Sequence, residues 1–165
     1  VLLIFDKNLL HNIDALIIVT IIVTIMNTNQ RFSISIHALT LLAANSTPLT
    51  SEMIAASVDT NPVVIRRTMA GLRERGLVES KPGAHGGWKL LRDPKQIPLC
   101  DIYLSLGDDD VLAIHAHPNE YCPIGGNIKD TLQEIFSVTQ NAMMDSLRQV
   151  TIADVLEDVR ARGKK

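Results

Sequence analysis

The stretch from Leu49 to Arg92 constrains the fold more than any other part of this chain. Within it, Asn61 and Pro62 precede a segment with helical periodicity, and Gly76 follows that segment. Three apolar residues recur there at spacings of four and three and so share one helix face: Ile65, Met69 and Leu72. Asparagine is a preferred N-cap residue, proline fits the first helical position, and glycine favours the left-handed backbone that ends a helix. The pattern therefore predicts a helix between Pro62 and Gly76.

A shorter apolar segment lies before this helix, and a hairpin pattern lies after it. The apolar run in residues 51–58 predicts a helix, and either Thr50 or Ser51 can serve as its N-cap. Residues 77–78 and 88–91 are strand-like runs on either side of a glycine-rich tip. Helix, turn, helix and hairpin in this order predict a winged helix-turn-helix, a mainly α fold with a small β-hairpin wing.

Positive charge gathers in the same stretch. Between Asn61 and Lys95, eight basic residues stand against three acidic ones, although the whole chain has a net charge of −2. Such segregation suits a surface that faces phosphate, with the second helix in the major groove and the wing beside it. The alternative is a solvated helix with ordinary surface arginines. We expect these residues to contact double-stranded DNA: Thr50, Ser51, Asn61, Pro62, Val63, Arg66, Arg67, Arg73, Lys81, Gly83, His85, Gly86 and Gly87.

Composition bounds the class of protein. A chain of 165 residues accommodates one domain with an extension, and an aromatic content of 4% favours an aliphatic, helical core. Two cysteines form no disulfide framework and suit a reducing cytoplasm. A first helix is predicted over residues 31–45. We divide the chain into an apolar extension at 1–25, a DNA-binding domain at 26–95, and a C-terminal region at 96–165 with a connecting helix, a sensor-like loop and a dimerisation helix.

Residues 1–25 differ in character from the rest of the chain. The uncharged run from Ala15 to Ile25 is shorter than the roughly 20 apolar residues that cross a bilayer. A basic start and a cleavage site of small residues, which mark a signal peptide, are both missing from this segment. We interpret it as an upstream extension of a working protein that begins at Met26, and we expect no membrane partner. A short membrane anchor is the alternative.

The loop before the last long helix contains the remaining candidate metal-binding and thiol residues. In the connecting helix that precedes it, Cys100 is expected to be a small buried hydrophobe. The loop itself contains His115, His117 and Cys122, which are residue types that bind soft metals, and Cys122 also suits a thiol sensor. A metal- or thiol-dependent module, enzyme or sensor, is therefore the alternative function. Three ligands make an incomplete metal site, so we expect a structural loop, no metal and no enzyme.

The longest helical pattern runs over residues 127–151, and we expect residues 152–159 to pack back as a last helical turn or two. A helix of about 25 residues is about 37 Å long, which is more than a small winged domain needs. We therefore expect it to pack against its twin in a homodimer; packing within its own chain is the alternative. The expected dimer contacts are Ile128, Leu132, Ile135, Thr139, Ala142, Met143 and Leu147.

From Met26 to about Val159, the chain resembles the Rrf2 family of bacterial winged-helix transcriptional regulators. The most specific part of the resemblance is the wing, residues 83–90, in which a double glycine precedes an aromatic residue and a leucine. Residues 61–67 and 72–78 also carry it. The resemblance implies a sequence-specific DNA-binding regulator that forms a homodimer, and we expect it to act as a repressor.

The cysteine content implies a branch within that family. Members that bind an iron–sulfur cluster use three cysteines in the loop before the dimerisation helix, whereas this chain has only Cys122 there. The resemblance therefore implies a cluster-free member without a cofactor. Its signal would be thiol oxidation, a small molecule or a partner protein.

Overall fold

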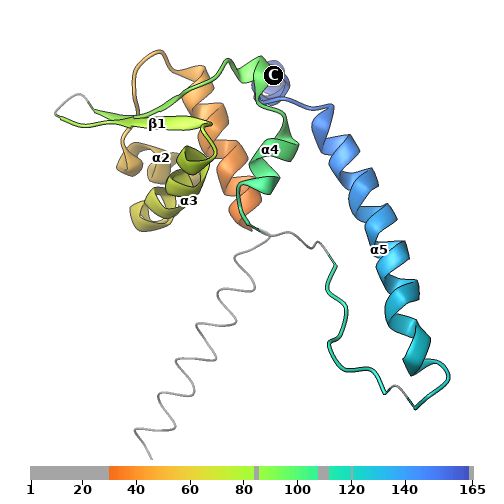
Figure 1. The fold of residues 1–165 in the computed structure, drawn as a ribbon. Coiled ribbons are helices and arrows are strands. Elements are labelled where there is room, and N and C mark those ends of the chain that lie inside the picture. The colour runs from red at the N-terminus through yellow and green to blue at the C-terminus, as the bar shows by residue number, and fades with distance from the viewer. Residues whose placement is uncertain (1–29, 84–85, 108–111, 120, 164–165) are drawn as a thin grey trace, which may run out of the picture.

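The computed structural model describes residues 30–83, 86–107, 112–119 and 121–163. A first helix covers residues 30–44. The elements that follow are α2 (Ser51–Val58), α3 (Pro62–Glu74), β1 (Val78–Lys81), β2 (Gly87–Leu90), the short 3-10 helix η1 (Pro94–Gln96), α4 (Leu99–Leu104), α5 (Gly125–Arg148) and α6 (Ile152–Arg162). Figure 1 shows α2, α3 and the first helix gathered against the hairpin, while α5 leads away from this body. The fold is the mainly α winged helix-turn-helix that the sequence predicts.

The core lies where the first helix, α2, α3 and α4 meet. It is aliphatic, and its fully buried side chains come from these four helices, from the segments that join them and from the first residue of α6: Leu39, Ile54, Ile65, Met69, Leu72, Leu77, Ile97, Ile102 and Ile152. Burying one such side chain contributes roughly 1.5–3 kcal/mol. Cys100 is buried among them, as expected.

Local sequence rules account for the ends of α2 and α3. The Thr50 side chain accepts a hydrogen bond from the Met53 N–H, so Thr50 rather than Ser51 is the N-cap of α2. The Asn61 Oδ1 atom accepts from the Val63 N–H at 2.8 Å, and proline occupies the first position of α3. Gly76 has a φ of +67°, which confirms the predicted stop. The caps therefore define where each helix begins, and Gly76 defines where α3 ends.

The wing is more than a two-stranded hairpin. β1 and β2 pair antiparallel, with Val78 opposite Leu90 and Lys81 opposite Gly87. Outside this pair, Leu49 forms an antiparallel bridge with Trp88. The chain just before α2 thus lies along the second edge of β2, and the wing is joined to the helix-turn-helix by backbone hydrogen bonds.

The C-terminal segment returns to the body through a second bridge, between Pro98 and Thr151. The Ile152 N–H donates to the Ile97 carbonyl at 3.0 Å, and Ile152 is fully buried. α6 then continues through Arg162, so the sequence expectation of one or two turns over residues 152–159 was too short. A capping box at Thr151 and an ion pair between Arg162 and Asp158 stabilise the longer helix.

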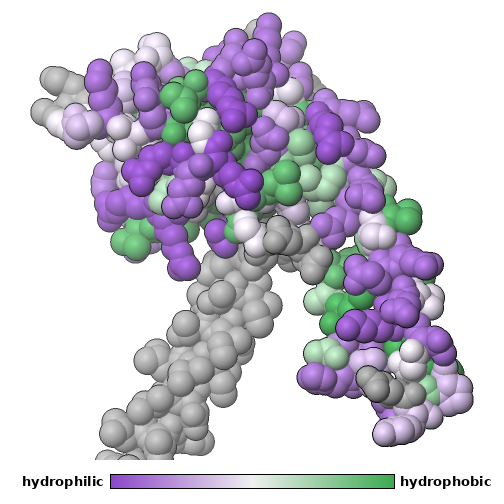
Figure 2. Space-filling model, viewed as in Figure 1, coloured by the Kyte–Doolittle hydropathy of each residue, from purple (hydrophilic) through white to green (hydrophobic). Residues whose placement is uncertain are grey.

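α5 has no buried residue in the described part of the chain. Its last turns lie beside α4, and Leu147 packs against the core. Farther from the body, green apolar patches lie among purple polar ones on its surface in Figure 2. Among the described residues, no helix combines the length and apolar character that a bilayer crossing needs.

Candidate nucleic-acid interface

α3 is sharply two-sided. Ile65, Met69 and Leu72 are fully buried, so the opposite side of the helix faces solvent. Val63, in the first turn, is 60% exposed, and Arg66 and Arg67 are exposed in the turn that follows. A recognition helix presents side chains of its N-terminal half to base edges in this way.

Arg66 and Arg67 differ in their partners. The guanidinium of Arg66 lies 3.0 Å from the carboxylate of Glu52 on α2, and both side chains are exposed. The pKa of Glu52 is lowered, first by a hydrogen bond from its own backbone N–H and then by Thr50 and Arg66. Arg67 makes no ion pair with the residues that the structure describes. An exposed pair such as Arg66–Glu52 is worth little, so DNA can compete for Arg66.

Ion pairs reduce the basic surplus that the sequence shows. Lys89 pairs across the hairpin with Glu79 at 2.7 Å, and Arg92 pairs with Asp101 of α4 at 3.3 Å. The basic residues between positions 61 and 95 that remain exposed without an ion pair to a described residue are Arg67, Arg73, Arg75, Lys81 and Lys95. They lie on the exposed side of α3 and at its C-terminal end, at the outer end of β1, and in η1 beyond the wing. The positive surface is therefore narrower than the charge count suggests.

The predicted contacts in the wing lie at its outer end. Lys81 is exposed at the end of β1, and Gly83 is exposed beyond it. Gly86 and Gly87 are half-buried at the start of β2, whereas His85 lies outside the described residues. The wing therefore carries an exposed cation, Lys81, which suits contact with a phosphate backbone.

Thr50 is exposed and Ser51 is buried, and the hydroxyls of both make hydrogen bonds within the protein. The Thr50 hydroxyl is engaged as the cap of α2. Ser51 is only 7% exposed, and its Oγ accepts a hydrogen bond from the Trp88 Nε1–H at 3.0 Å. Trp88 was not among the predicted site residues, although a tryptophan directly after a double glycine was a visible signal.

The described residues of the loop before α5 do not gather into one binding site. His115 and His117 are exposed, and Cys122 is half-buried just ahead of α5. Backbone hydrogen bonds from Gly125 and Ile124 lower the pKa of the Cys122 thiol. Burial, and then the charge of Asp101, raise the pKa of Cys100. The two thiols thus differ in reactivity, and only Cys122 suits nucleophilic chemistry.

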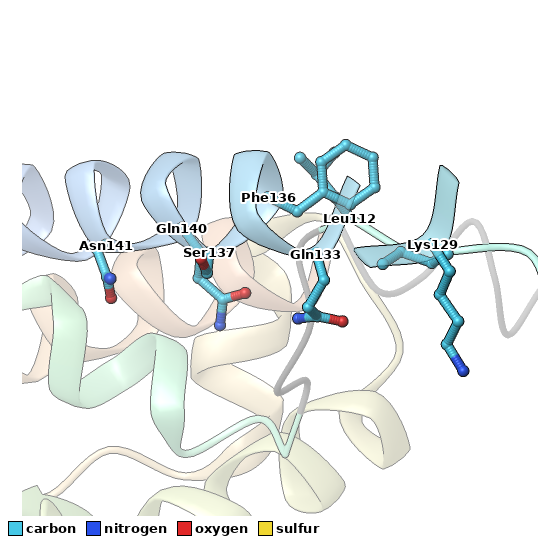
Figure 3. Close-up of a pocket in the computed structure, with 8 residues that line it drawn as sticks. Leu112, Lys129, Gln133, Phe136, Ser137, Gln140 and Asn141 are labelled. Carbon is cyan, nitrogen blue, oxygen red and sulfur yellow. The ribbon is translucent and has the colours of Figure 1, made fainter. Parts of the chain in front are cut away.

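An open hollow of about 400 Å³ lies between this loop and α5. The hollow is lined by Leu112 and Ile114 from the loop and by side chains from one face of α5 (Figure 3): Lys129, Gln133, Phe136, Ser137, Gln140 and Asn141. Amide and hydroxyl groups in an open, solvated hollow do not form a catalytic arrangement with a base and an activated nucleophile. The hollow does not support the enzyme alternative.

Comparison with known proteins agrees with the winged fold. The family model for Rrf2, described as an iron-dependent transcriptional regulator, matches residues 28–158. YwnA of Bacillus subtilis (strain 168), named as a candidate HTH-type transcriptional regulator, is 36% identical over 129 residues, which are 78% of this chain and 96% of YwnA.

Solved structures show the same architecture. A protein described as a candidate DNA-binding protein is 33% identical, with a TM-score of 0.63 over 76% of this chain and 98% of its own. A candidate transcriptional regulator from Lactobacillus plantarum is 27% identical, with a TM-score of 0.68 over 81% of this chain and 91% of its own.

The iron dependence in the family description needs a set of metal ligands. Within the described ranges, no three His, Cys, Asp or Glu side chains lie close enough together to hold a metal ion. Cys100 is buried in α4, so it does not complete a thiolate set with Cys122 in the loop. The described residues therefore do not fit an iron site. With its fold, its exposed recognition helix and its matched relatives, the chain belongs to the Rrf2 family of DNA-binding transcriptional regulators.

Proposed function

We propose that this regulator binds promoter DNA as a homodimer in the cytoplasm and represses transcription by occluding the promoter. The observation that carries the proposal is the exposed N-terminal half of α3, flanked by the wing. In this arrangement α3 enters the major groove, and the wing follows the adjacent backbone. Repression needs no further surface, because a protein seated on the promoter excludes polymerase.

The exposed residues of this surface take two roles. Asn61 and Val63 lie at the start of α3, where side chains reach base edges. Arg66 and Arg67 contact the groove or its phosphates. Arg73 in the last turn of α3 and Lys81 in the wing contact phosphates farther along. Phosphate contacts position the protein and base contacts specify the sequence, so the two groups differ in what their loss does.

The homodimer rests on the exposed apolar side of α5. Ile135 is 53% exposed and Val138 is 68% exposed, although both lie within a helix of 24 residues. A helix that exposes large apolar residues along its length requires a partner to cover them. Of the predicted contacts, Leu147 packs against the core of its own chain, so we place the dimer contact along the earlier turns of α5. A twofold pair places two copies of α3 about one DNA turn, or a multiple of it, apart.

The signal is proposed to act at the loop that ends at Cys122. The lowered pKa of this thiol favours the thiolate, which is the nucleophile that reacts with oxidants. Oxidation ahead of the first turn of α5 would alter how α5 meets its partner and so the spacing of the two recognition helices. No cofactor is part of this proposal.

The test is binding of the full chain to the duplex upstream of its own gene and to an unrelated duplex of equal length, over a series of salt concentrations. We expect selective binding with a steep salt dependence. Arg67→Ala should weaken binding by about tenfold and reduce the salt slope by about one, because it removes a phosphate or groove contact. Arg162→Ala, at the end of α6, is the matched control and should change neither. Equal, weak binding of both duplexes would contradict the proposal.

A further inference from the structure

Trp88 joins the wing to the helix-turn-helix at two levels, backbone and side chain. In the backbone, the Leu49 N–H donates to the Trp88 carbonyl at 3.0 Å, and the Trp88 N–H donates to the Leu49 carbonyl at 2.8 Å. These two bonds are reciprocal, as in a short antiparallel ladder. β2 is therefore held between β1 and the segment that leads into α2.

The approach of these two segments leaves no room for a side chain at position 87. Gly87 has a φ of +144°, and a Cβ there would lie 2.6 Å from the Leu49 carbonyl oxygen. Only glycine combines this backbone conformation with so close a contact. The double glycine thus brings Trp88 into register with Leu49.

The indole adds a bond that reaches the helix itself. Its Nε1–H donates to the Oγ of Ser51 at 3.0 Å, across 37 positions of sequence. Ser51 is the first residue of α2, directly after the cap Thr50, and it is buried. A shielded hydrogen bond of this kind is costly to leave unmade, because water does not readily replace either partner. Its geometry therefore restricts the tilt of the wing.

Because α2 packs against α3, the restriction on the wing also applies relative to the recognition helix. Ile54 of α2 and Ile65 of α3 are both fully buried in the same core cluster. On the surface, Glu52 of α2 pairs with Arg66 of α3. The wing, α2 and α3 are thus held as one unit, with the Trp88–Ser51 bond at the joint between the wing and the helices.

We propose that Trp88 is a positioning residue for DNA binding, with Ser51 as its partner, and that together they hold the wing at a set angle to α3. The inference rests on the proposed contacts of α3 and the wing with DNA. It also assigns Ser51 a different role from the one its sequence position suggests, since its hydroxyl is turned toward the wing. A wing that is already in place loses less conformational freedom on binding.

Three variants of the full chain test the role of the Trp88–Ser51 hydrogen bond. Each is titrated against the duplex upstream of the protein's own gene. Trp88→Phe keeps an aromatic ring and removes the N–H donor, and Ser51→Ala removes the acceptor. Each should weaken binding about fivefold, the net worth of one hydrogen bond. The double variant should be no weaker than either single one. Ser57→Ala, on the same helix but bonded to the exposed His37, is the control and should leave affinity unchanged.

A second titration separates positioning from general stability. Lys81→Ala should lower affinity and the salt slope in the parent protein, because it removes a phosphate contact by the wing. In the Trp88→Phe background the same change should have a smaller effect, because the wing no longer holds Lys81 against the DNA. Independent, additive effects would show that Trp88 acts only through stability and would overturn the inference.

Amide hydrogen exchange in the DNA-free protein tests, without any duplex, whether the Trp88–Ser51 bond holds the wing against the helices. In Trp88→Phe and in Ser51→Ala, protection should fall at the amides of Leu49 and of β1, while Ile65 and Met69 in α3 stay protected. Unchanged protection at Leu49 and β1 would overturn the inference even if DNA binding fell. If the parent protein bound both duplexes equally, the proposed function would fail, and the exchange result would still decide whether Trp88 holds the wing.

Discussion

At the scale of single residues, the two cysteines illustrate how position sets chemistry. Cys122 lies just before α5, where backbone N–H groups of Gly125 and Ile124 stabilise its thiolate. Cys100 lies in the core, where burial disfavours the charged form. The same side chain is therefore a reactive group in one place and a small hydrophobe in the other.

Alkylation should separate the two thiols. Because its pKa is lowered, Cys122 should reach half-maximal reaction rate with iodoacetamide at a pH below that of a free cysteine. Cys100 should react only when the chain unfolds, since its thiol is buried and its pKa is raised. Peptide mass spectrometry over a pH series gives both rates. Equal rates at neutral pH would contradict the assigned environments.

Gly87 should tolerate no side chain. Gly87→Ala should lower the free energy of unfolding by about 2 kcal/mol or more, because strain in φ adds to the collision with the Leu49 carbonyl. Gly76→Ala meets an open position, and so should cost only about 1 kcal/mol for its left-handed backbone. Urea denaturation of the two variants, with matched slopes, measures the difference. A cost for Gly87→Ala no larger than for Gly76→Ala would show that Leu49 moves away.

At the scale of elements, caps explain why the last helix is longer than expected. The Thr151 hydroxyl accepts from the Asp154 N–H, and the Asp154 carboxylate accepts from the Thr151 N–H at 2.8 Å. This capping box satisfies donors that the first turn of a helix leaves free. α6 then extends to Arg162, whose ion pair with Asp158 spans one turn. Periodicity alone did not reveal this extent, because the exposed end of α6 carries few apolar residues.

Removing the cap should weaken the C-terminal segment. Thr151→Ala should destabilise the protein by about 1 kcal/mol, measured by thermal or urea unfolding. Thr151→Ser keeps the hydroxyl and serves as the control, with little change expected. A cost for Thr151→Ser as large as for Thr151→Ala would point to lost methyl packing instead of the cap.

The same capping box should respond to acid. The hydrogen bonds from Thr151 lower the pKa of Asp154 in the folded protein, so its stabilisation is complete above the unfolded pKa of about 3.9. That stabilisation is lost as the pH falls through the folded value. Asp154→Asn should therefore be less stable than the parent at neutral pH, and the difference should vanish on acidification. A difference that stays constant from pH 7 to pH 2 would exclude the carboxylate as its source.

At the scale of the whole molecule, α5 is the helix that a single chain does not bury. It extends from the winged body and buries none of its residues there, whereas α2, α3 and α4 each bury several. Such a helix contributes little to the stability of a single chain. Its sequence is explained by the second copy that we propose to cover it.

A charge on the apolar side of α5 should therefore separate the two copies. Ile135→Glu should convert the dimer to a monomer in analytical ultracentrifugation, because a buried carboxylate without a partner is strongly unfavourable. DNA affinity should fall by about a hundredfold with the loss of bivalent binding. Ser137→Glu introduces the same charge two residues on, where the helix has turned by about 200°, and should leave the dimer intact. A dimer that survives Ile135→Glu would place the contact elsewhere.

The fold was predictable where short-range rules dominate. Asn61, Pro62 and Gly76 define the limits of α3 within a few residues of themselves, and the spacing of Ile65, Met69 and Leu72 selects its buried face. These features depend on backbone geometry and on the hydrophobic effect along one helix. A single sequence carries both.

The same local rules do not predict contacts between residues that are far apart in the sequence. The sequence alone determined a helix-turn-helix with a wing, because caps, turns and helical periodicity are local properties of the chain. Only the tertiary structure decided that Ser51 faces Trp88 instead of solvent, and that Glu52 and Asp101 engage two of the arginines. Hydrogen bonds and ion pairs between distant residues form where packing brings them together, and packing depends on the whole chain at once.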